Sequence, residues 1–297
     1  MGVSLKGISL LKLLSVSIFV LSVISCRTLI DKFGKSKDEG DYCQANFSPN
    51  EMLPHSQVDD LDLDVYVVNL ESNTPNPQIN EVSKNRRDTI SQRLQELGIS
   101  FEFFKATYGR VYSLPENNQD KNSVMLNSKV WKVQKFGKTN EYEYIYKTFR
   151  PKFSWGELGH RITFYELFKK IANNSRPALI LEDDAFIDDY FKAKIHYTLT
   201  NAPEQWRLLY LYCPDTHIRK TSERFYSPIK SKFLTNIAQI IKPDVAGDIA
   251  EKMLPFDDYP TDEWLARFPG IHRVYCSCPN YVHHTEQGST INIEGRR

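Results

Sequence analysis

The sequence has almost no net charge. Its 38 lysine and arginine residues balance 37 aspartate and glutamate residues, which leaves a formal charge of +1 at pH 7. A chain so close to neutrality has no global electrostatic attraction for nucleic acid, so any phosphate binding must come from local charge. Nucleic acid is therefore not an expected partner.

The sequence also has few cysteines, and they lack the paired spacing of a structural zinc site. The five are Cys26, Cys43, Cys213, Cys276 and Cys278. Only one residue separates Cys276 from Cys278, which is shorter than the usual metal or redox spacing. We interpret the cysteines as packing residues, and one disulfide remains open if the domain lies in an oxidising compartment.

The composition is that of an ordinary globular protein. Hydrophobic residues make up 41% of the 297 residues and charged residues 25%. These figures exclude a disordered, collagenous or multi-span membrane protein. The length suits one large domain or two small ones.

The first 30 residues have the pattern of a targeting segment. Lys6 and Lys12 precede an apolar stretch from Leu13 to Ser25, as a charged region precedes the hydrophobic region of a signal sequence. Residues 23–26, Val-Ile-Ser-Cys, resemble a bacterial lipoprotein cleavage box, whereas thirteen apolar residues are short for a bilayer span. A cleaved lipoprotein signal and an uncleaved signal anchor both remain open, and both predict a membrane-associated protein.

Residues 31–62 are predicted to be a linker, and residues 63–297 the folded domain. The linker is polar, with Pro49, Pro54 and few periodic apolar residues.

A buried strand that ends in three carboxylates is the most informative stretch of the domain. Ala178 to Leu181 form an apolar run suited to a strand buried on both faces, and Glu182, Asp183 and Asp184 follow it directly. Adjacent carboxylates repel and are costly to bury, so they need compensation. A hard divalent cation, Mn²⁺ or Mg²⁺, suits carboxylate oxygens at this edge of a sheet. The alternative is a solvated acidic turn without function.

The region before this strand predicts a parallel sheet. Asp64 to Leu70 read as a strand, Lys84 to Leu97 as a helix that Gly98 ends, and Phe101 to Ala106 as a second strand. A strand, helix and strand within about forty residues form a βαβ unit with a right-handed crossover.

A β-hairpin insertion is predicted between residues 110 and 150. Its two strands would be Val130 to Gln134 and Tyr142 to Phe149. Further along, the pattern predicts three more helices and two more strands. The first helix follows Ser154, the second covers Phe191 to Leu199 and the third begins at Pro243. The strands cover Trp206 to Tyr212 and the vicinity of Val274.

The domain contains a set of short motifs in a fixed order: Asn69-Leu70, the arginines Arg86, Arg87 and Arg93, residues 106–109 (Ala-Thr-Tyr-Gly), residues 156–159 (Gly-Glu-Leu-Gly), residues 182–184 (Glu-Asp-Asp), the acidic stretch from Asp257 to Asp262, and residues 289–291 (Ser-Thr-Ile). In this order they resemble glycosyltransferase family 25, which includes lipopolysaccharide-type bacterial galactosyltransferases and collagen galactosyltransferases. Each motif alone is weak, and the ordered set carries the resemblance. One departure is Thr163-Phe164, where the family has Ser-His, and His160 one turn earlier is a possible substitute.

The resemblance implies a GT-A-like, Rossmann-like α/β fold with a mixed, mainly parallel sheet flanked by helices. It also implies an inverting transfer from a nucleotide sugar assisted by Mn²⁺ or Mg²⁺. Asp184 is then the first candidate for the metal and Asp183 the second, while Glu182 would meet ribose or a metal-bound water. His283 is a further metal candidate, although a surface histidine is the competing interpretation.

The remaining candidates concern the sugar donor and the catalytic base. Asn69 and one of Arg86 and Arg87 are expected to contact the donor, although most helical arginines are merely solvated. Asp257 and Asp262 are the candidates for the base that deprotonates the acceptor hydroxyl, and a solvated acidic loop is their alternative.

The expected function is hexose transfer to a glycan or hydroxylated acceptor, with galactose from uridine diphosphate galactose (UDP-galactose) as the expected sugar. The expected partners are thus a UDP-sugar, such an acceptor, and a membrane through the N-terminal segment. The competing function is a membrane-anchored carbohydrate-binding or interaction protein with a degenerate glycosyltransferase fold, suggested by the missing Ser-His and the lipoprotein-like terminus.

Overall fold

The structure is a computed structural model. It describes residues 60–71, 74–109, 112–113, 123–126, 129–132, 155–213, 218–220, 225–228, 235–254, 256, 260–267, 273–277 and 280–284. All of them belong to the unit Ala45–Arg297. The predicted signal segment and most of the linker lie outside these ranges. Within them, no helix is both long enough and apolar enough to cross a membrane.

An eight-stranded mixed sheet forms the centre of the domain. Its order is β2-β1-β6-β11-β8-β12-β10-β9. The strands are β2 (Glu102–Lys105), β1 (Asp64–Asn69), β6 (Ala178–Glu182), β11 (Ala238–Ile241), β8 (Leu208–Tyr210), β12 (Val274–Ser277), β10 (Phe225–Pro228) and β9 (Ile218–Lys220). Only β11 and β10 run against the other six. The predicted mixed, mainly parallel α/β architecture and the parallel βαβ unit are confirmed.

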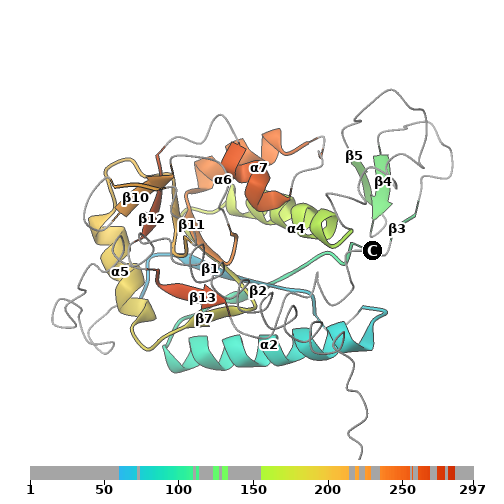
Figure 1. The fold of residues 1–297 in the computed structure, drawn as a ribbon, viewed down its shortest axis with the longest axis horizontal. Helices are drawn as coiled ribbons and strands as arrows, with labels where there is room; N and C mark the ends of the chain where they lie inside the picture. Colours follow the sequence, from blue (N-terminus) through green and yellow to red (C-terminus); the bar gives the residue numbers. More distant parts are fainter. Residues whose placement is uncertain are drawn as a thin grey trace, which may run out of the picture. The chain divides into compact units, whose positions relative to one another are not determined.

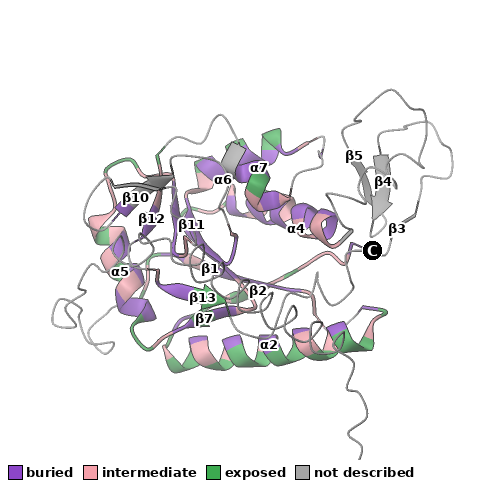
Figure 2. Cartoon of the chain, in the orientation of Figure 1, coloured by how far each residue is buried: buried purple, intermediate pink, exposed green. Residues whose placement is uncertain are grey.

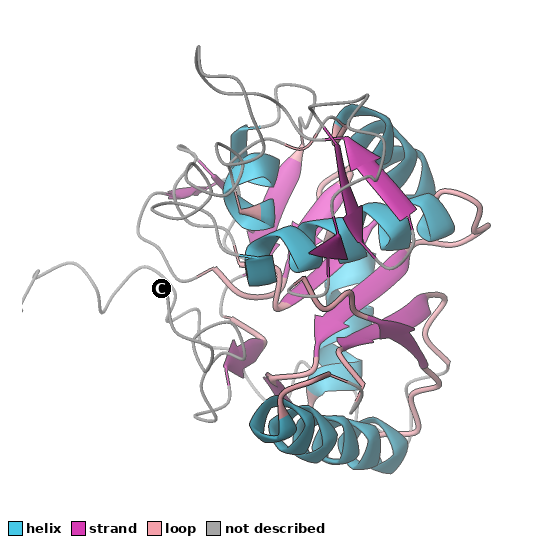
Figure 3. Cartoon of the chain, turned by 90° about the vertical axis from the view of Figure 1, so that its right-hand side faces the viewer, coloured by secondary structure: helices cyan, strands magenta, loops and turns pink. Residues whose placement is uncertain are grey.

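Helices cover both faces of this sheet (Figures 1 and 3). Helix α2 (Pro77–Glu96) lies on one face. Helices α4 (Trp155–Ile171), α6 (Pro243–Lys252) and α7 (Thr261–Arg267) lie on the other. Helix α5 (Phe191–Asn201) follows a short strand, β7 (Ala185–Ile187), which pairs with β13 (Val282–His284) in a separate two-stranded sheet.

The core is continuous through β6, as its apolar run predicts. Leu179 and Leu181 are fully buried in the cluster that includes Ile90 and Leu94 of α2. Ile180 is equally buried, but strand alternation turns its side chain to the opposite face. Burial of each of these large aliphatic side chains contributes about 1.5–3 kcal/mol, so β6 is firmly anchored up to its charged end. Figure 2 shows the buried residues concentrated in the sheet and on the facing sides of the helices.

Helix α2 begins seven residues before the predicted start at Lys84. Asn76 is the N-cap, and its side chain accepts hydrogen bonds from the backbone N–H of Gln78 and Ile79. Pro77 fits the first turn because it has no N–H that needs a partner there. The Asn-Pro pair therefore marks the start of the helix. The helix ends as predicted, with Gly98 in the left-handed region at φ 63°.

The insertion contains a three-stranded antiparallel sheet in the order β3-β4-β5, where the prediction had a two-stranded hairpin. Its strands are β3 (Tyr112–Ser113), β4 (Ser123–Leu126) and β5 (Lys129–Lys132). The predicted strand Val130 to Gln134 overlaps β5, but β5 pairs with the upstream β4. Because Leu126 pairs with Lys129, the connection has two residues, a length typical of tight hairpins. The predicted partner Tyr142 to Phe149 lies outside the described residues.

Two of the cysteines form a disulfide, the alternative that the sequence left open beside their interpretation as packing residues. Cys213, just after β8, is bonded to Cys276 of the neighbouring strand β12. The bond crosses between parallel neighbours that are far apart in the sequence, a relation that cysteine spacing alone does not reveal. Disulfides of this kind are typical of proteins in oxidising compartments.

Candidate active site

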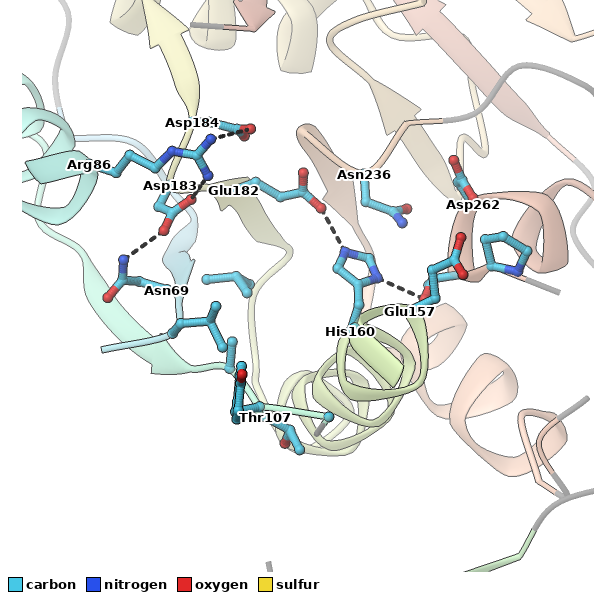
Figure 4. Close-up of a pocket in the computed structure, with 18 of the residues that line it drawn as sticks. Asn69, Arg86, Thr107, Glu157, His160, Glu182, Asp183, Asp184, Asn236 and Asp262 are labelled. Atoms are coloured by element: carbon cyan, nitrogen blue, oxygen red, sulfur yellow. Dashed lines mark hydrogen bonds and ion pairs between the residues drawn. The ribbon is translucent and has the colours of Figure 1, made fainter. Parts of the chain in front are cut away.

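The carboxylates at the end of β6 point to opposite sides of the sheet. Side chains alternate along a strand, so Glu182 faces α4 while Asp183 faces α2. Figure 4 shows the two groups diverging, with Glu182 directed at His160 and Asp183 at Arg86 and Asn69. The acidic cluster therefore supplies both walls of one cavity.

The wall on the α2 side is an ion pair supported by an amide. Arg86 is 3% exposed, and its guanidinium lies 3.2 Å from Asp183 Oδ1 and 3.5 Å from Asp184 Oδ2. Asn69, at the end of β1, donates from Nδ2 to Asp183 Oδ2 at 2.6 Å and to Ser83 Oγ at 3.0 Å. Arg86 is thus a compensating charge for the acidic cluster.

The two aspartates differ in their affinity for protons. Burial raises the pKa of Asp183 to about 7, although Arg86 and Asn69 partly oppose this. Burial acts the same way on Asp184, but the interaction with His284 and the charge of Arg86 outweigh it and lower its pKa. The same interaction with Asp184, whose Oδ2 is 3.8 Å from His284 Nδ1, raises the pKa of His284. Near neutral pH Asp184 therefore keeps its negative charge, whereas Asp183 can take up or release a proton.

The wall on the α4 side is centred on His160. Its Nε2 lies 2.7 Å from Glu182 Oε1, and its Nδ1 lies 2.9 Å from Thr261 Oγ1. Burial lowers the pKa of His160, but Glu182 outweighs burial and raises it overall. Asp262, which follows Thr261 on α7, also lines the cavity, and burial raises its pKa. His160 thereby connects the carboxylate at the strand end with the helix that carries Asp262.

Two of the sequence motifs meet in a single contact at the floor of the cavity. A Cβ added to Gly159 would lie 2.4 Å from Thr107 O and 2.7 Å from Gly109 N, so α4 can approach residues 106–109 only because residue 159 is glycine. The Thr163 hydroxyl accepts from Thr107 N–H at 2.8 Å and donates to Gly159 O at 2.7 Å. Thr163 thus locks the loop to the helix through a hydroxyl group that serine also carries.

Phe164, which stands where the family pattern has histidine, does not take the place of that histidine at the cavity. Phe164 is fully buried, and its ring centroid lies 4.5 Å from that of His160. Phe164 therefore does not reach the cavity, whereas His160, one helical turn earlier, lines it.

These walls enclose a cavity of about 390 Å³. Of the predicted site residues, those that line it are Asn69, Arg86, Glu182, Asp183, Asp184 and Asp262. Arg87 does not line it, because its guanidinium lies over the Phe103 ring at 3.7 Å from the centroid. Asp257, the other candidate base, lies outside the described residues.

The histidine that lines the cavity is His284 and not the predicted His283. Both histidines of β13 are exposed, but His284 lies next to Asp184 and lines the cavity, whereas His283 does not line it. The sequence shows two adjacent histidines, but only the register of β13 against β7 decides which one lies at the cavity. Asn236 and Thr261 are further lining residues without a recognisable sequence signal.

The carboxylates at the end of β6 could bind a cation only together with further ligands, such as phosphate oxygens of a substrate. Within the described ranges, no group of three or more His, Cys, Asp and Glu side chains is arranged to hold a metal ion. Asp184 Oδ1 is nevertheless buried without a hydrogen-bond partner in that part of the chain. Magnesium is commonly held by one or two carboxylates together with substrate phosphates, and this donor set fits that arrangement.

An α/β sheet with a polar cavity at the carboxyl ends of its strands is the architecture of many enzymes that bind nucleotides. Residues 64–246 match the family described as "Glycosyltransferase family 25 (LPS biosynthesis protein)". The chain therefore belongs to glycosyltransferase family 25, as its motifs predicted. It is also similar to a "Glycosyltransferase 25 family member" of Aedes aegypti, with 24% identity over 263 residues. That alignment covers 77% of this chain and 39% of the Aedes protein, so the chain spans well under half of its relative's length.

Proposed function

We propose that this glycosyltransferase moves a hexose, with galactose from UDP-galactose as the first candidate, onto a glycan or hydroxylated acceptor. The reaction would be metal-assisted and inverting, and the N-terminal segment would associate the enzyme with a membrane. One observation carries the proposal: the carboxylates of β6 and α7 face a single cavity that also contains a buried arginine.

The α2 wall would bind the leaving diphosphate. Asp183 and Asp184 would hold Mn²⁺ or Mg²⁺ together with phosphate oxygens, and the cation would neutralise the charge that develops on the leaving group. Arg86 keeps both carboxylates in place and adds positive charge beside them. Asn69 fixes the Asp183 carboxylate through its 2.6 Å hydrogen bond.

Asp262 would act as the base on the opposite wall. It would take the proton of the acceptor hydroxyl while that oxygen forms a bond to the anomeric carbon, and the bond from this carbon to the diphosphate oxygen would break with its electron pair. Burial raises the pKa of Asp262, which strengthens it as a base. His160 would position this wall through Glu182 and Thr261.

The test is release of UDP from a panel of UDP-sugars by the full-length protein, with Mn²⁺ or with EDTA. Asp184→Asn should weaken binding of UDP with Mn²⁺ measured by calorimetry. Asp262→Asn should spare that binding and lower turnover by about a hundredfold to ten-thousandfold. Asp244→Asn, at an exposed carboxylate on α6, is the matched control.

Two results would count against the proposal. If the protein neither binds UDP nor releases it from any sugar in the panel, the degenerate carbohydrate-binding alternative replaces transfer. If Asp262→Asn turns over normally while Asp184→Asn does not, transfer stands but the assignment of the base to Asp262 fails.

A further inference from the structure

An aromatic ring is exposed directly beyond the acidic cluster. On β7, Ala185 and Ile187 are buried, whereas Phe186 between them is 56% exposed. Phe186 pairs with His283 of β13, so their side chains stand next to each other on the outward face of this small sheet. Among the described residues, only Phe186 and Tyr190 are large hydrophobic side chains with high exposure.

A second hollow, of about 410 Å³, lies beside this ring between β7 and α2. Its volume is within the range of small-molecule sites. Figure 1 shows β7 between β13 and α2. The helix contributes polar side chains spaced three and four residues apart, and β7 and the turn after it contribute the ring and a carboxylate. The lining used in this argument is Thr89, Gln92, Arg93, Glu96, Phe186 and Asp188.

The polar groups of the hollow are ordered by contacts among themselves. Arg93 donates from Nε to Ile187 O at 3.1 Å and forms ion pairs with Glu96 and Asp189. Gln92 donates from Nε2 to Glu96 Oε1 at 2.8 Å. The hollow therefore presents amide and carboxylate groups next to a flat apolar ring.

This hollow lies next to the candidate active site along two elements. Asp184 and His284 line the first cavity, and the next residue, Ala185, which pairs with His284, lines the second. On α2, Arg86 lines the first and Arg93 the second, seven residues or about 10 Å further along the helix. A short oligosaccharide can span that separation.

We propose that Phe186 and this hollow form a binding subsite for a glycan acceptor, at a sugar residue beyond the one that receives the hexose. The inference rests on the proposed function. The apolar face of a pyranose ring would pack on the exposed Phe186 ring. Its hydroxyl groups would donate to the carboxylates and to the Gln92 amide oxygen.

The chemistry of the hollow favours a neutral sugar over other ligands. A lipid or an apolar helix would need a continuous apolar surface, and Phe186 is the large exposed hydrophobic side chain in this lining. An anionic ligand would meet Glu96, Asp188 and Asp189, while Arg93 is already paired with two of these carboxylates. A ligand rich in hydroxyl donors meets neither obstacle.

The test is binding of the full-length protein to a printed array of neutral oligosaccharides of two to six sugars. The dissociation constant of the strongest binder is then measured in solution. Phe186→Ala should raise this dissociation constant about tenfold or more, equal to about 1.4 kcal/mol. Phe186→Tyr, which keeps an aromatic ring, should bind like the wild type. Thr89→Trp, at an exposed position of α2 that lines the hollow, should also weaken oligosaccharide binding, because the indole ring would fill the hollow. Tyr190→Ala is the matched control, because Tyr190 is similarly exposed but does not line the hollow.

The outcomes separate this subsite from the proposed transferase activity. If the wild-type protein binds oligosaccharides no better than methyl galactoside, or if Phe186→Ala and Thr89→Trp bind like the wild type, the subsite is refuted. Release of UDP from UDP-galactose without an acceptor is measured in parallel. If the wild type neither binds UDP nor releases it from any sugar of the panel, while its array binding depends on Phe186, transfer is overturned and the glycan site stands.

Discussion

Replacement of Arg86 by methionine should show how strongly the acidic cluster depends on one buried cation. The guanidinium is 3% exposed, and its partners Asp183 and Asp184 are 12% and 14% exposed. Because all three groups are shielded from water, the loss is that of a buried ion pair broken on one side, about 3–5 kcal/mol. For a domain of this size each kcal/mol lowers the melting temperature by about 2–4 °C. The expected decrease is therefore about 6–20 °C.

The loss should depend on pH in a defined direction. Without Arg86, Asp183 can relieve its buried charge by taking up a proton, and its pKa is already raised to about 7 by burial. The destabilisation should therefore be smaller at pH 5.5 than at pH 8. In a double-mutant cycle at pH 8, Asp183→Asn should recover a large part of the stability that Arg86→Met removes.

The assay is thermal or urea unfolding in EDTA, monitored by circular dichroism. Arg86→Lys is the control, because it keeps the charge but not the two-pronged geometry, and it should lose less than Arg86→Met. A loss below about 1 kcal/mol for Arg86→Met at pH 8 would refute the reasoning, since exposed pairs have that magnitude. Equal losses at pH 5.5 and pH 8 would refute the role assigned to Asp183.

Three further outcomes are expected from the contacts described above. In EDTA, the wild type and Asp183→Asn should be similarly stable near pH 4, where Asp183 is protonated. As the pH rises through about 7, the wild type should become the less stable of the two. Parallel curves of unfolding free energy against pH, from urea titrations, would contradict the raised pKa of Asp183. Gly159→Ala should lower the free energy of unfolding by about 1–3 kcal/mol, because its Cβ would overpack against the backbone of residues 107–109. Gly247→Ala is the control and should lose less stability, because its added Cβ would meet only Ala172 Cβ at 3.5 Å. Equal melting temperatures of the two variants would show that α4 can shift freely. Cys213→Ser should lose about 2–5 kcal/mol and make the melting temperature insensitive to reductant, so an unchanged response to dithiothreitol would show that the disulfide does not form in solution.

Local patterns predicted most of the elements around the site. The apolar run at residues 178–181 with the carboxylates after it, and the glycine at residue 98, each act within a few residues of the chain. The wrong helix start came from a local signal that was given too little weight, and the missed strand β11 depends on partners far away in the sequence. Asn76 and Pro77 start a helix that the apolar periodicity places later, and β11 is a short strand whose place between β6 and β8 depends on both neighbours.

The sequence by itself determined the family, the buried strand and its acidic end, and six of the residues that line the cavity, because backbone periodicity and adjacent charges are properties of consecutive residues. The tertiary structure decided how these parts meet. It directs Glu182 to His160 and Asp183 to Arg86, places His284 and not His283 at the cavity beside Asp184, and joins Cys213 to Cys276. Each of these relations depends on strand register or helix packing between residues far apart in the chain, which no local pattern encodes.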